Sequence, residues 1–567
     1  MAGAQPIVGA VVQVYAAGTT GNGSAATALL TSVLTTDATG SFTVPAAYPC
    51  PAASSQLYLL VRSGKVGTSS DNSAITLATI LGPCNQVSAA SQVVVNEVTT
   101  AATVWGLSQF LSTGANLGSS ATNTQGLANA FATVANLADL TKGTSPGAAF
   151  PATGASPAAK VNTLANLLNT CTSTAGTACT KLFAAATPIG ASAPINTLDA
   201  ALNLIRNPGL NVATLYTQST TSTAFAPALT KAPSDWTLFI HYSGGGMSAP
   251  GGLGVDSTGN VWVSGYFGVA SKFSPAGQPL IPNGVSTTGL KNSYGLAIDA
   301  SDNVWIPYES SPYAVNKGHG SVSVLNSSGQ SISGATGFSS GGLNFPIAAA
   351  IDTNGNAWVV NYGNSTITLL SSTGQPLSGA SAYTAPSFAF AVAVAVDANN
   401  NAWIGDQNDD VITRISTDGT QSLRVSCCNG PGGLAIDQRG YVWAANFYGD
   451  SVSQISSTGA VIYSGYTGGG ILHPQGIAID GSGNVWVANF RGPSLTQLAG
   501  SASSNPGQVL SPAAGWAPDS NMIEAFAVAI DASGNLWISN FGSDTLTEFV
   551  GLAVPVKTPL IGPPQAP

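Results

Sequence analysis

A thirteen-residue segment, Ala478 to Phe490 (Ala-Ile-Asp-Gly-Ser-Gly-Asn-Val-Trp-Val-Ala-Asn-Phe), recurs with variation seven times in the second half of the chain. Each copy has an aspartate followed six residues later by a tryptophan, and successive aspartates lie 40 to 53 residues apart. A period of about 40–50 residues containing several short strands indicates a β-propeller, so the repeat predicts seven blades. The seven pairs are Asp256/Trp262, Asp299/Trp305, Asp352/Trp358, Asp397/Trp403, Asp437/Trp443, Asp480/Trp486 and Asp531/Trp537.

The apolar runs on both sides of each aspartate fit buried strands joined by a tight turn. The third residue after each aspartate is Gly, Asn or Asp, types that tolerate the positive φ of a hairpin turn. We expect the carboxylate to accept hydrogen bonds from the turn and the tryptophan to pack between blades. Calcium binding by the aspartates is the alternative, but the turn role explains all seven without a metal. The turn residues are Gly259, Asp302, Gly355, Asn400, Gly440, Gly483 and Gly534.

The chain has 567 residues, more than one ordinary domain, and only 7% of them are charged, with a net charge of −9. Low charge argues against a disordered polyelectrolyte, and the lack of a basic stripe argues against nucleic acid as a partner. The sequence contains no run of about 18 apolar residues, so it predicts no transmembrane segment. The first residues show no signal peptide, which leaves either a cytosolic protein or one whose signal segment is absent from this sequence.

The six cysteines favour export. None has the CxxC spacing of a metal site, and the chain has only 3 histidines to complete a zinc site. We therefore expect disulfides in a secreted, periplasmic or cell-surface protein. For the adjacent Cys427 and Cys428, the sequence leaves open a vicinal disulfide or two buried thiols. Each pair falls within one predicted module: Cys50 and Cys84, Cys171 and Cys179, Cys427 and Cys428.

Residues 1–95 are predicted to form a small β-sandwich from four strands, stapled by the first cysteine pair. The motif Gly-Ala-x-Val-x-Val-Tyr followed by Thr-Asp-x-x-Gly-x-Phe resembles the transthyretin-like, or carboxypeptidase-regulatory-like, domains of exported bacterial proteins. That resemblance implies a spacer or adhesion module. The expected strands are Ile7–Tyr15, Leu30–Thr35, Gly40–Val44 and Gln56–Arg62.

Residues 96–230 change to helical periodicity and are predicted to form an α-helical connector, whose helices pack on one another or on the sandwich. The expected helices are Asn96–Leu111, Thr124–Leu140, Ala158–Leu168 and Asn196–Ile205.

Residues 231–554 are assigned to the propeller, which makes the fold class mainly β. The segment Trp236–Tyr242 precedes the first repeat, and we expect it to form the outer strand of the seventh blade. The Pro-rich tail, residues 555–567, is expected to run over the surface.

The repeat pattern Gly-x-Ala-x-Asp…Gly-Asn-x-Trp-x-x-Asn-Phe, over residues 235–552, resembles NHL repeats and the seven-bladed propeller of streptogramin B lyases. This resemblance is specific for the fold, but propellers host binding modules, enzymes and scaffolds alike. The resemblance to the lyases implies a magnesium-assisted elimination that uses a histidine base near a glutamate. The closely spaced Glu-x-His pattern of such a site is absent from this sequence.

Propeller ligands sit at one mouth of the central channel, where the loops after each second strand meet the loops entering each first strand. An Asn-rich ring with adjacent aromatic residues would suit a polyhydroxylated ligand, because amides bond hydroxyls and rings stack on sugar faces. In the alternative, each Asn caps its own loop and each ring packs between blades. The candidate ligand residues are Asn361, Asp406, Asn446, Asn489, Asn540, Tyr308, Tyr266, Phe447, Phe490 and Phe541.

Three residues could support catalysis in place of simple binding. His319 and His473, with Glu309, could face one mouth and hold a divalent cation or act as acid and base. His241 lies in an expected strand and is interpreted as structural. No dedicated metal site and no organic cofactor is predicted.

The sequence favours an exported, non-catalytic binding or scaffold protein, whose propeller mouth binds a carbohydrate, a wall polymer or a protein partner. A metal-assisted lyase or hydrolase of the streptogramin B lyase type is one alternative. Self-association into an extracellular structural protein is another, because a surface with few charges lacks electrostatic repulsion.

Overall fold

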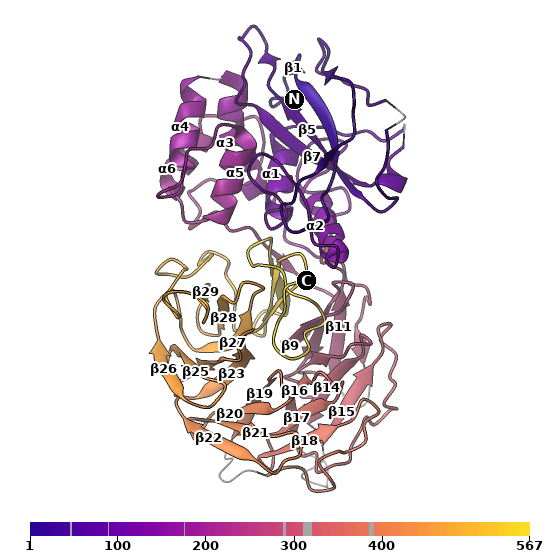
Figure 1. Cartoon of the computed structure of the whole chain (residues 1–567), viewed down its shortest axis with the longest axis vertical. Helices are drawn as coiled ribbons and strands as arrows, with labels where there is room; N and C mark the ends of the chain where they lie inside the picture. The colour runs from indigo at the N-terminus through magenta and orange to yellow at the C-terminus, as the bar shows by residue number, and fades with distance from the viewer. Residues whose placement is uncertain (46–47, 89, 175, 287–290, 310–319, 385–389) are drawn as a thin grey trace. The chain divides into compact units, whose positions relative to one another are not determined.

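The computed structural model describes residues 1–567 apart from 46–47, 89, 175, 287–290, 310–319 and 385–389. The chain is mainly β and divides into two compact units (Figure 1). The first unit comprises Met1–Ile240 and Phe549–Leu552, and the second comprises His241–Glu548 and Ala553–Pro567. Within the described residues, no helix has the length and apolarity needed to cross a membrane.

The β part of the first unit is a five-stranded antiparallel sheet in the order β3-β2-β5-β7, with β4 also paired to β2, and a separate pair β1-β6. The expected strand Gly40–Val44 is wrong: these residues form no strand, although Phe42 and Val44 pack against the buried core. The long strand β7 was not predicted. The strands are β1 (Ile7–Val8), β2 (Val11–Ala16), β3 (Thr27–Ala28), β4 (Leu34–Thr35), β5 (Gln56–Arg62), β6 (Lys65–Val66) and β7 (Thr76–Pro83).

The helices belong to the same compact unit as this sheet. Helix α1 is buried along its whole length and contacts β7, and its first turn is capped by Asn96, whose side chain accepts from the Thr99 N–H at 3.0 Å. All four expected helices are present, and α4 and α6 are additional. The helices are α1 (Glu97–Gly106), α2 (Thr124–Leu137), α3 (Ala158–Thr174), α4 (Thr177–Ala185), α5 (Thr197–Arg206) and α6 (Val212–Ser219), with a short 3₁₀ turn η1 (Cys84–Gln86).

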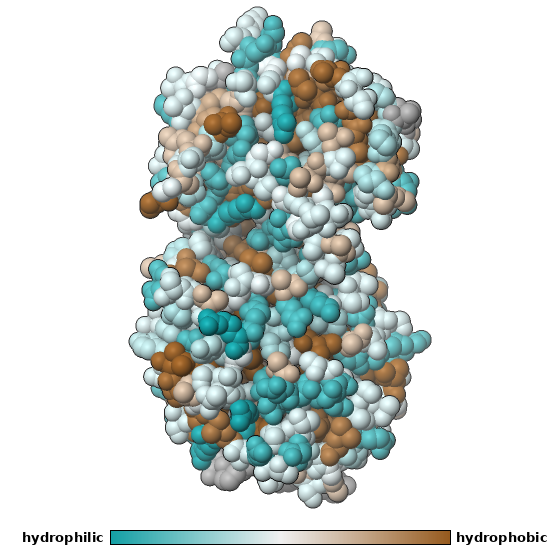
Figure 2. Space-filling model, viewed as in Figure 1, coloured by the Kyte–Doolittle hydropathy of each residue, from teal (hydrophilic) through white to brown (hydrophobic). Residues whose placement is uncertain are grey.

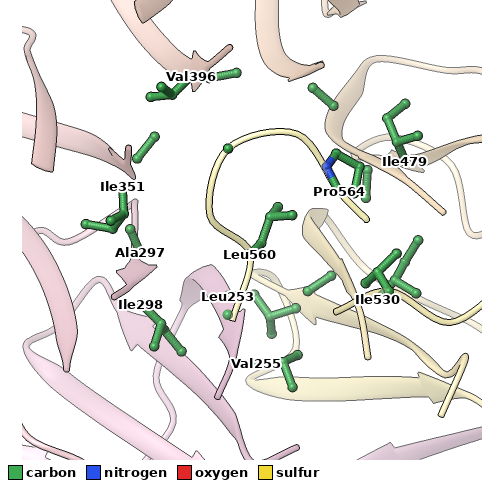
Figure 3. A pocket seen from close by; sticks show the side chains of 18 of the residues that line it. Leu253, Val255, Ala297, Ile298, Ile351, Val396, Ile479, Ile530, Leu560 and Pro564 are labelled. Carbon is green, nitrogen blue, oxygen red and sulfur yellow. The ribbon is translucent and has the colours of Figure 1, made fainter. Parts of the chain in front are cut away.

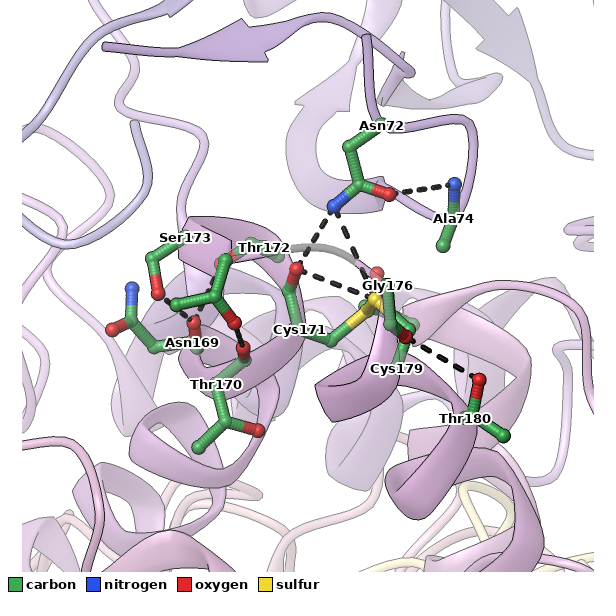
Figure 4. The surroundings of a disulfide bond; sticks show 12 residues. Asn72, Ala74, Asn169, Thr170, Cys171, Thr172, Ser173, Gly176, Cys179 and Thr180 are labelled. Atoms are coloured by element: carbon green, nitrogen blue, oxygen red, sulfur yellow. Dashed lines mark hydrogen bonds between the residues drawn. A yellow bond between two sulfur atoms is a disulfide. The ribbon is translucent and has the colours of Figure 1, made fainter. Parts of the chain in front are cut away.

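All six cysteines form disulfides, in the pairs suggested by the sequence. The Cys171–Cys179 bond joins α3 to α4, so it links two helices and does not close a plain loop (Figure 4). The Asn72 amide donates to the Cys171 carbonyl at 2.8 Å beside this bond. Cys427 and Cys428 form a vicinal disulfide.

The second unit contains seven antiparallel sheets, in each of which the first strand pairs with the second and the second with the third. The first three sheets are β9 (Pro250–Val255), β10 (Val261–Gly265), β11 (Val269–Phe273) and β12 (Val285–Ser286); β13 (Ala297–Ile298), β14 (Val304–Glu309) and β15 (Gly320–Leu325); and β16 (Pro346–Ile351), β17 (Ala357–Asn361) and β18 (Thr366–Leu370).

Two four-stranded sheets and one three-stranded sheet follow, and the seventh sheet takes its outer strand from the other end of the repeat region. These strands are β19 (Ala391–Val396), β20 (Ala402–Asp406), β21 (Val411–Ile415) and β22 (Ser422–Ser426); β23 (Pro431–Ile436), β24 (Val442–Asn446), β25 (Ser451–Ile455) and β26 (Val461–Tyr466); β27 (Pro474–Ile479), β28 (Val485–Asn489) and β29 (Leu495–Leu498); and β30 (Ala525–Ile530), β31 (Leu536–Asn540), β32 (Thr545–Phe549) and β8 (Phe239–Tyr242).

The first strands of the seven sheets contact one another in a closed ring, from β9 through β30 and back to β9. The seven-bladed propeller predicted from the repeat is therefore confirmed. The prediction that a strand near residues 236–242 completes the seventh blade is also confirmed, because β8 pairs with β32. The buried tryptophans contribute to the packing between blades: Trp262, Trp305, Trp358, Trp403 and Trp443 each lie in a cluster with apolar residues of the following blade.

The seven repeat aspartates hold the turns between first and second strands. In every blade, one carboxylate oxygen accepts from the backbone N–H groups two and four residues later. For Asp480 these bonds come from Ser482 and Asn484, both at 2.9 Å. The carboxylates are thus engaged by their own turns, as the turn interpretation requires.

Figure 2 shows one face of the molecule, on which pale and teal atoms predominate and brown, apolar atoms form small separate patches. This pattern fits a chain rich in small polar residues with few charges.

Candidate ligand-binding mouth of the propeller

The first strands of the blades line a central channel that contains two cavities, separated by a ring of apolar side chains. One residue from each blade lines both cavities, and none of these residues is polar. The ring is Leu253, Leu296, Ala349, Val394, Leu434, Ile477 and Val528. The channel has no polar pathway through its middle, so each end must be considered by itself.

The end near the repeat aspartates holds a cavity of about 200 Å³ that the C-terminal tail partly fills. Figure 3 shows Leu560 and Pro564 of the tail among residues of several blades, including Val396, Ile479 and Ile530. The tail, expected to run over the surface, crosses the end of the channel, where some of its residues are exposed. Apolar tail residues contribute to the lining of this cavity; Val556 is buried there, whereas Leu560 is 56% exposed.

Backbone groups fix the tail's path from blade to blade. The Val554 carbonyl accepts from Gly481 N–H at 3.1 Å, and the Val556 N–H donates to the Asp531 carbonyl at 3.3 Å. Farther along, the Thr558 hydroxyl donates to the Asp256 carbonyl at 3.0 Å. The Gly562 N–H then donates to the Ile351 carbonyl at 3.3 Å, so the tail bonds to blades 7, 6, 1 and 3.

The opposite end opens into a larger cavity of about 510 Å³, which we call the mouth. We call its seven aromatic lining residues the wall, and the apolar ring forms its floor. The polar side chains among its described lining residues are three tyrosines, two glutamines and one glutamate. The aromatic and polar lining residues are Tyr294, Tyr362, Phe390, Phe447, Tyr448, Phe490, Phe526, Glu309, Gln407 and Gln475.

The aromatic rings of the mouth contact one another around much of its rim. Phe447 lies 5.7 Å from Phe490, Phe490 lies 6.4 Å from Phe526, and Phe526 lies 6.0 Å from Tyr294, measured between ring centroids. Tyr362 and Phe390 form a separate edge-to-face pair at 4.4 Å. Such mutual contacts hold the rings in place before any ligand arrives, which reduces the entropy lost on binding.

The expected Asn-rich ring does not face the mouth. The amides of Asn361, Asn446, Asn489 and Asn540 are buried and donate to side-chain or backbone oxygens of the third strand in their own blades. The Asn361 amide, for example, donates to Thr366 and Thr368 at 3.0 and 2.9 Å. Asp406 is buried too, and accepts from the Phe390 N–H at 3.1 Å. This placement favours the alternative in which these residues fasten their own loops.

The aromatic candidates are divided between the mouth and its support. Phe447 and Phe490 line the mouth, as expected. Tyr266 and Phe541 lie behind its wall, with ring centroids 5.1 and 6.4 Å from that of Tyr294. Tyr308 is buried away from it, and its hydroxyl donates to the Thr336 carbonyl at 2.6 Å.

The three residues considered for catalysis are not brought together by the described part of the structure. Glu309 lines the mouth, whereas His473 is not among the lining residues; its ring packs edge-on against Phe447 and its Nδ1 lies 3.2 Å from an Asp450 carboxylate oxygen. His319 lies outside the described residues. No group of three or more His, Cys, Asp or Glu side chains suited to a metal ion occurs among the residues described.

His241, in β8, contacts the neighbouring strand β32 and the loop that precedes β30, as its structural interpretation expects. One ring nitrogen lies 2.7 Å from the Ser520 carbonyl oxygen and the other lies 2.8 Å from the Thr547 hydroxyl. Burial lowers the pKa of the ring, which favours the neutral imidazole that can serve both partners.

Five aromatic residues of the mouth are absent from the predicted ligand residues: Tyr294, Tyr362, Phe390, Tyr448 and Phe526. Tyr294 and Phe526 stand five positions before the aspartate of their repeats, at the start of the first strand. Across the seven repeats that position varies from glycine to phenylalanine within an otherwise regular frame. A variable position in a regular repeat is the signal that could have identified them.

No family model matches the chain, and no curated protein matches it. Among solved structures, it is similar to virginiamycin B lyase from Staphylococcus aureus, with 14% identity, a TM-score of 0.42, and coverage of 55% of this chain and 99% of that one. It is also similar to the WD40 β-propeller domain of Doa1, with 13% identity, a TM-score of 0.40, and coverage of 54% and 97%.

A third similar structure is the extracellular domain of the putative hybrid two-component system BT4673 from B. thetaiotaomicron. The identity is 13%, the TM-score is 0.39, and the coverage is 53% of this chain and 39% of that one. Similarity at these levels assigns no function to the chain.

Proposed function

We propose that the protein is a non-catalytic carbohydrate-binding protein of an extracellular or periplasmic compartment, and that the aromatic mouth of the propeller is its binding site. The supporting observation is a cavity of about 510 Å³ whose wall is formed by seven aromatic residues and whose polar groups are few. Sugar rings present flat C–H faces that stack on aromatic rings, while their hydroxyls bond to amides and phenols.

The polar groups of the mouth are suited to hydrogen-bond the hydroxyls at the edge of a sugar ring. Gln407 and Gln475 each offer an amide with both donor and acceptor atoms, and Tyr362 and Tyr448 offer phenol groups. The Gln475 amide is held by the Gly432 carbonyl at 3.3 Å, which orients it at the wall. The aromatic contacts and this bond indicate a preorganised site.

The extracellular or periplasmic location is supported by the three disulfides, because such bonds persist in oxidising compartments. In this proposal the first unit acts as a spacer or adhesion module, the role implied by the transthyretin-like motif. We also propose that the repeats are of the NHL type.

A lyase-type activity is the rival proposal, and the placement of His473 does not favour it. A histidine base must reach the substrate that the glutamate also contacts, but this ring packs against Phe447 outside the lining of the mouth.

Calorimetric titration with a panel of soluble oligosaccharides tests the function. At least one glycan is expected to bind in the presence of a chelator, and Phe490→Ala is expected to weaken it about tenfold, the loss of roughly 1.4 kcal/mol of stacking. Tyr463→Ala, which removes an exposed ring from the outer strand β26, is the matched control and should leave affinity unchanged.

Two results would overturn the proposal. One is the absence of binding across a panel of neutral, acidic and amino-containing glycans. The other is binding that Phe490→Ala and Tyr362→Ala both leave unchanged while the thermal midpoints stay at the wild-type value. Metal-dependent conversion of a bound ligand would establish the rival activity.

A further inference from the structure

Glu309 is the only acidic or basic side chain among the described residues that line the mouth. It is the last residue of β14 and is half-buried. All other lining residues are apolar, aromatic, glycine or glutamine. Among the described lining residues, this carboxylate is the one charged group that an incoming ligand would meet.

Among the described residues, the carboxylate has an amide donor beside it and no ion-pair partner. The Asn292 amide donates to one of its oxygens at 3.3 Å. Within the described part of the chain, no Lys, Arg or His nitrogen lies within 4.0 Å of it. Burial raises the pKa of Glu309, and the hydrogen bond from Asn292 opposes that rise.

Tyr294 and Tyr362 line the mouth together with Glu309. Burial is the main cause that raises the pKa of both phenols, and the negative charge of Glu309 raises each of them further. The faces of these two rings also carry negative electrostatic potential. Carboxylate and rings therefore act in the same direction, and together they favour a positively charged group in this part of the mouth.

A neutral sugar and a positively charged sugar would gain different amounts from this arrangement. A neutral ring stacks on the aromatic wall but leaves the carboxylate without a counter-charge. An ammonium group adds a charge-assisted hydrogen bond to the carboxylate and a cation–π contact with a neighbouring ring. In a partly desolvated cavity such contacts are worth more than they are on an open surface.

We infer that the mouth selects a glycan with free primary amines, an amino sugar such as a glucosamine oligomer, with one ammonium group bound by Glu309 and the sugar faces stacked on the aromatic wall. This inference rests on the proposed carbohydrate-binding function and names the class of sugar. It excludes the N-acetylated form of the same sugar as the preferred ligand, because acetylation removes the charge.

The test compares glucosamine oligomers, N-acetylglucosamine oligomers and glucose oligomers of equal length by calorimetric titration of the full chain. The wild-type protein is expected to bind the glucosamine oligomer at least about tenfold more tightly than either neutral oligomer, in line with about 1.5–3 kcal/mol for a hydrogen bond to a charged group. Glu309→Gln keeps the size of the side chain and is expected to reduce this preference to less than about twofold.

Glu524→Gln is the matched control. Glu524 precedes the first strand of the seventh blade, and its carbonyl accepts from the Phe541 N–H, but it does not line the mouth. This substitution changes the net charge of the protein by the same amount and should leave the preference intact. A preference that falls equally in both variants would assign the effect to overall charge and overturn the inference.

The outcomes separate this inference from the function on which it rests. Equal affinity of the wild-type protein for charged and neutral oligomers overturns the inference and leaves carbohydrate binding in place. A preference for glucosamine oligomers that Glu309→Gln does not change also overturns it. If no oligomer of any kind binds, the proposed function itself fails. Thermal midpoints of both variants at the wild-type value establish that a loss of preference is not a loss of folding.

Discussion

The indole N–H of Trp486 donates to the carboxylate of Asp480, six residues earlier, at 3.1 Å. The other oxygen of that carboxylate accepts from the backbone of the turn between the two residues. One aspartate thus fixes both the hairpin and the orientation of a large buried ring. The same indole bond occurs in four other blades, at Trp305, Trp403, Trp443 and Trp537.

Asp480→Ala is expected to lower the free energy of unfolding of the propeller by about 2–4 kcal/mol, because it removes several hydrogen bonds and leaves a buried indole N–H unpaired. Asp418→Ala is the control. Asp418 accepts similar bonds in the exposed turn between β21 and β22, and its removal should have little effect. Urea denaturation followed by tryptophan fluorescence measures both. Equal shifts of the two midpoints would refute the structural role of the Asp–Trp bond.

Glu548 makes the stability of the propeller depend on pH. It is fully buried, accepts from the Tyr242 hydroxyl at 2.8 Å and from the Asn535 amide at 2.9 Å, and burial raises its pKa from 4.5 to about 8. Between these two values the folded state binds more protons than the unfolded state, so stability is highest near the lower value and falls as the pH rises toward about 8.

Glu548→Gln is expected to flatten this decline, since the amide keeps an acceptor for Tyr242 and carries no charge at any pH. Thermal midpoints measured at intervals from about pH 4.5 to 8.5 give the two slopes. Burial also raises the pKa of the neighbouring Asp531, so a smaller decline should persist in the variant. Parallel slopes in variant and wild type would show that Glu548 is not the responsible group.

Removal of residues 554–567 is expected to lower the thermal midpoint and to increase the fluorescence of a hydrophobic dye. The tail partly fills the apolar cavity at the end of the channel near the aspartates, and its removal exposes side chains such as Ile298 and Ile351 to water. Ligand binding at the opposite mouth should persist, because the apolar ring separates the two cavities. Unchanged dye fluorescence in the truncated protein would contradict the sealing role.

Replacement of Cys171 and Cys179 by serine is expected to destabilise the protein by about 2–3 kcal/mol, the chain-entropy value for a loop of this size. The bond spans 8 positions and joins two helices. The matched control is the double serine variant of Cys427 and Cys428, whose bond closes essentially no loop. Calorimetry should show a clearly smaller effect for the control. A larger effect there would mean that loop entropy does not govern these bonds.

The propeller was predictable because the same Asp–Trp repeat occurs seven times in the sequence. The spacing from Asp480 to Trp486 encodes a strand, a turn and a second strand, and six further copies reinforce it. The closing strand β8 was predictable by elimination, since the last repeat lacks an outer strand. In the first unit, by contrast, each element occurs once, and α4, α6 and β7 carried no repeated signal to identify them.

The mouth was predicted in outline but not in its chemistry. Phe447 and Phe490 were placed correctly by their position after the second strand. Asn361 occupies the position in its blade that directly precedes the one held by Phe447 and Phe490 in theirs. Because strand side chains alternate, the Asn361 side chain points toward the third strand of its own blade. The variable position five residues before the repeat aspartate marks Tyr294, but whether its side chain faces the mouth depends on how the seven first strands converge. The path of the tail could not be predicted for the same reason, because it depends on an apolar cavity that exists only after the ring closes.

The pairing of β8 with β32 sets a limit on when the propeller can be completed. Tyr242 and Glu548 are 306 positions apart. At about 5–20 residues per second, a ribosome needs roughly 15–60 s to make that length of chain. Throughout this interval the seventh sheet cannot form and the edges of the growing array have no neighbour. The strand β8 therefore waits for its partner until almost all of the repeat region has been synthesised, and the ring closes only at the end of synthesis.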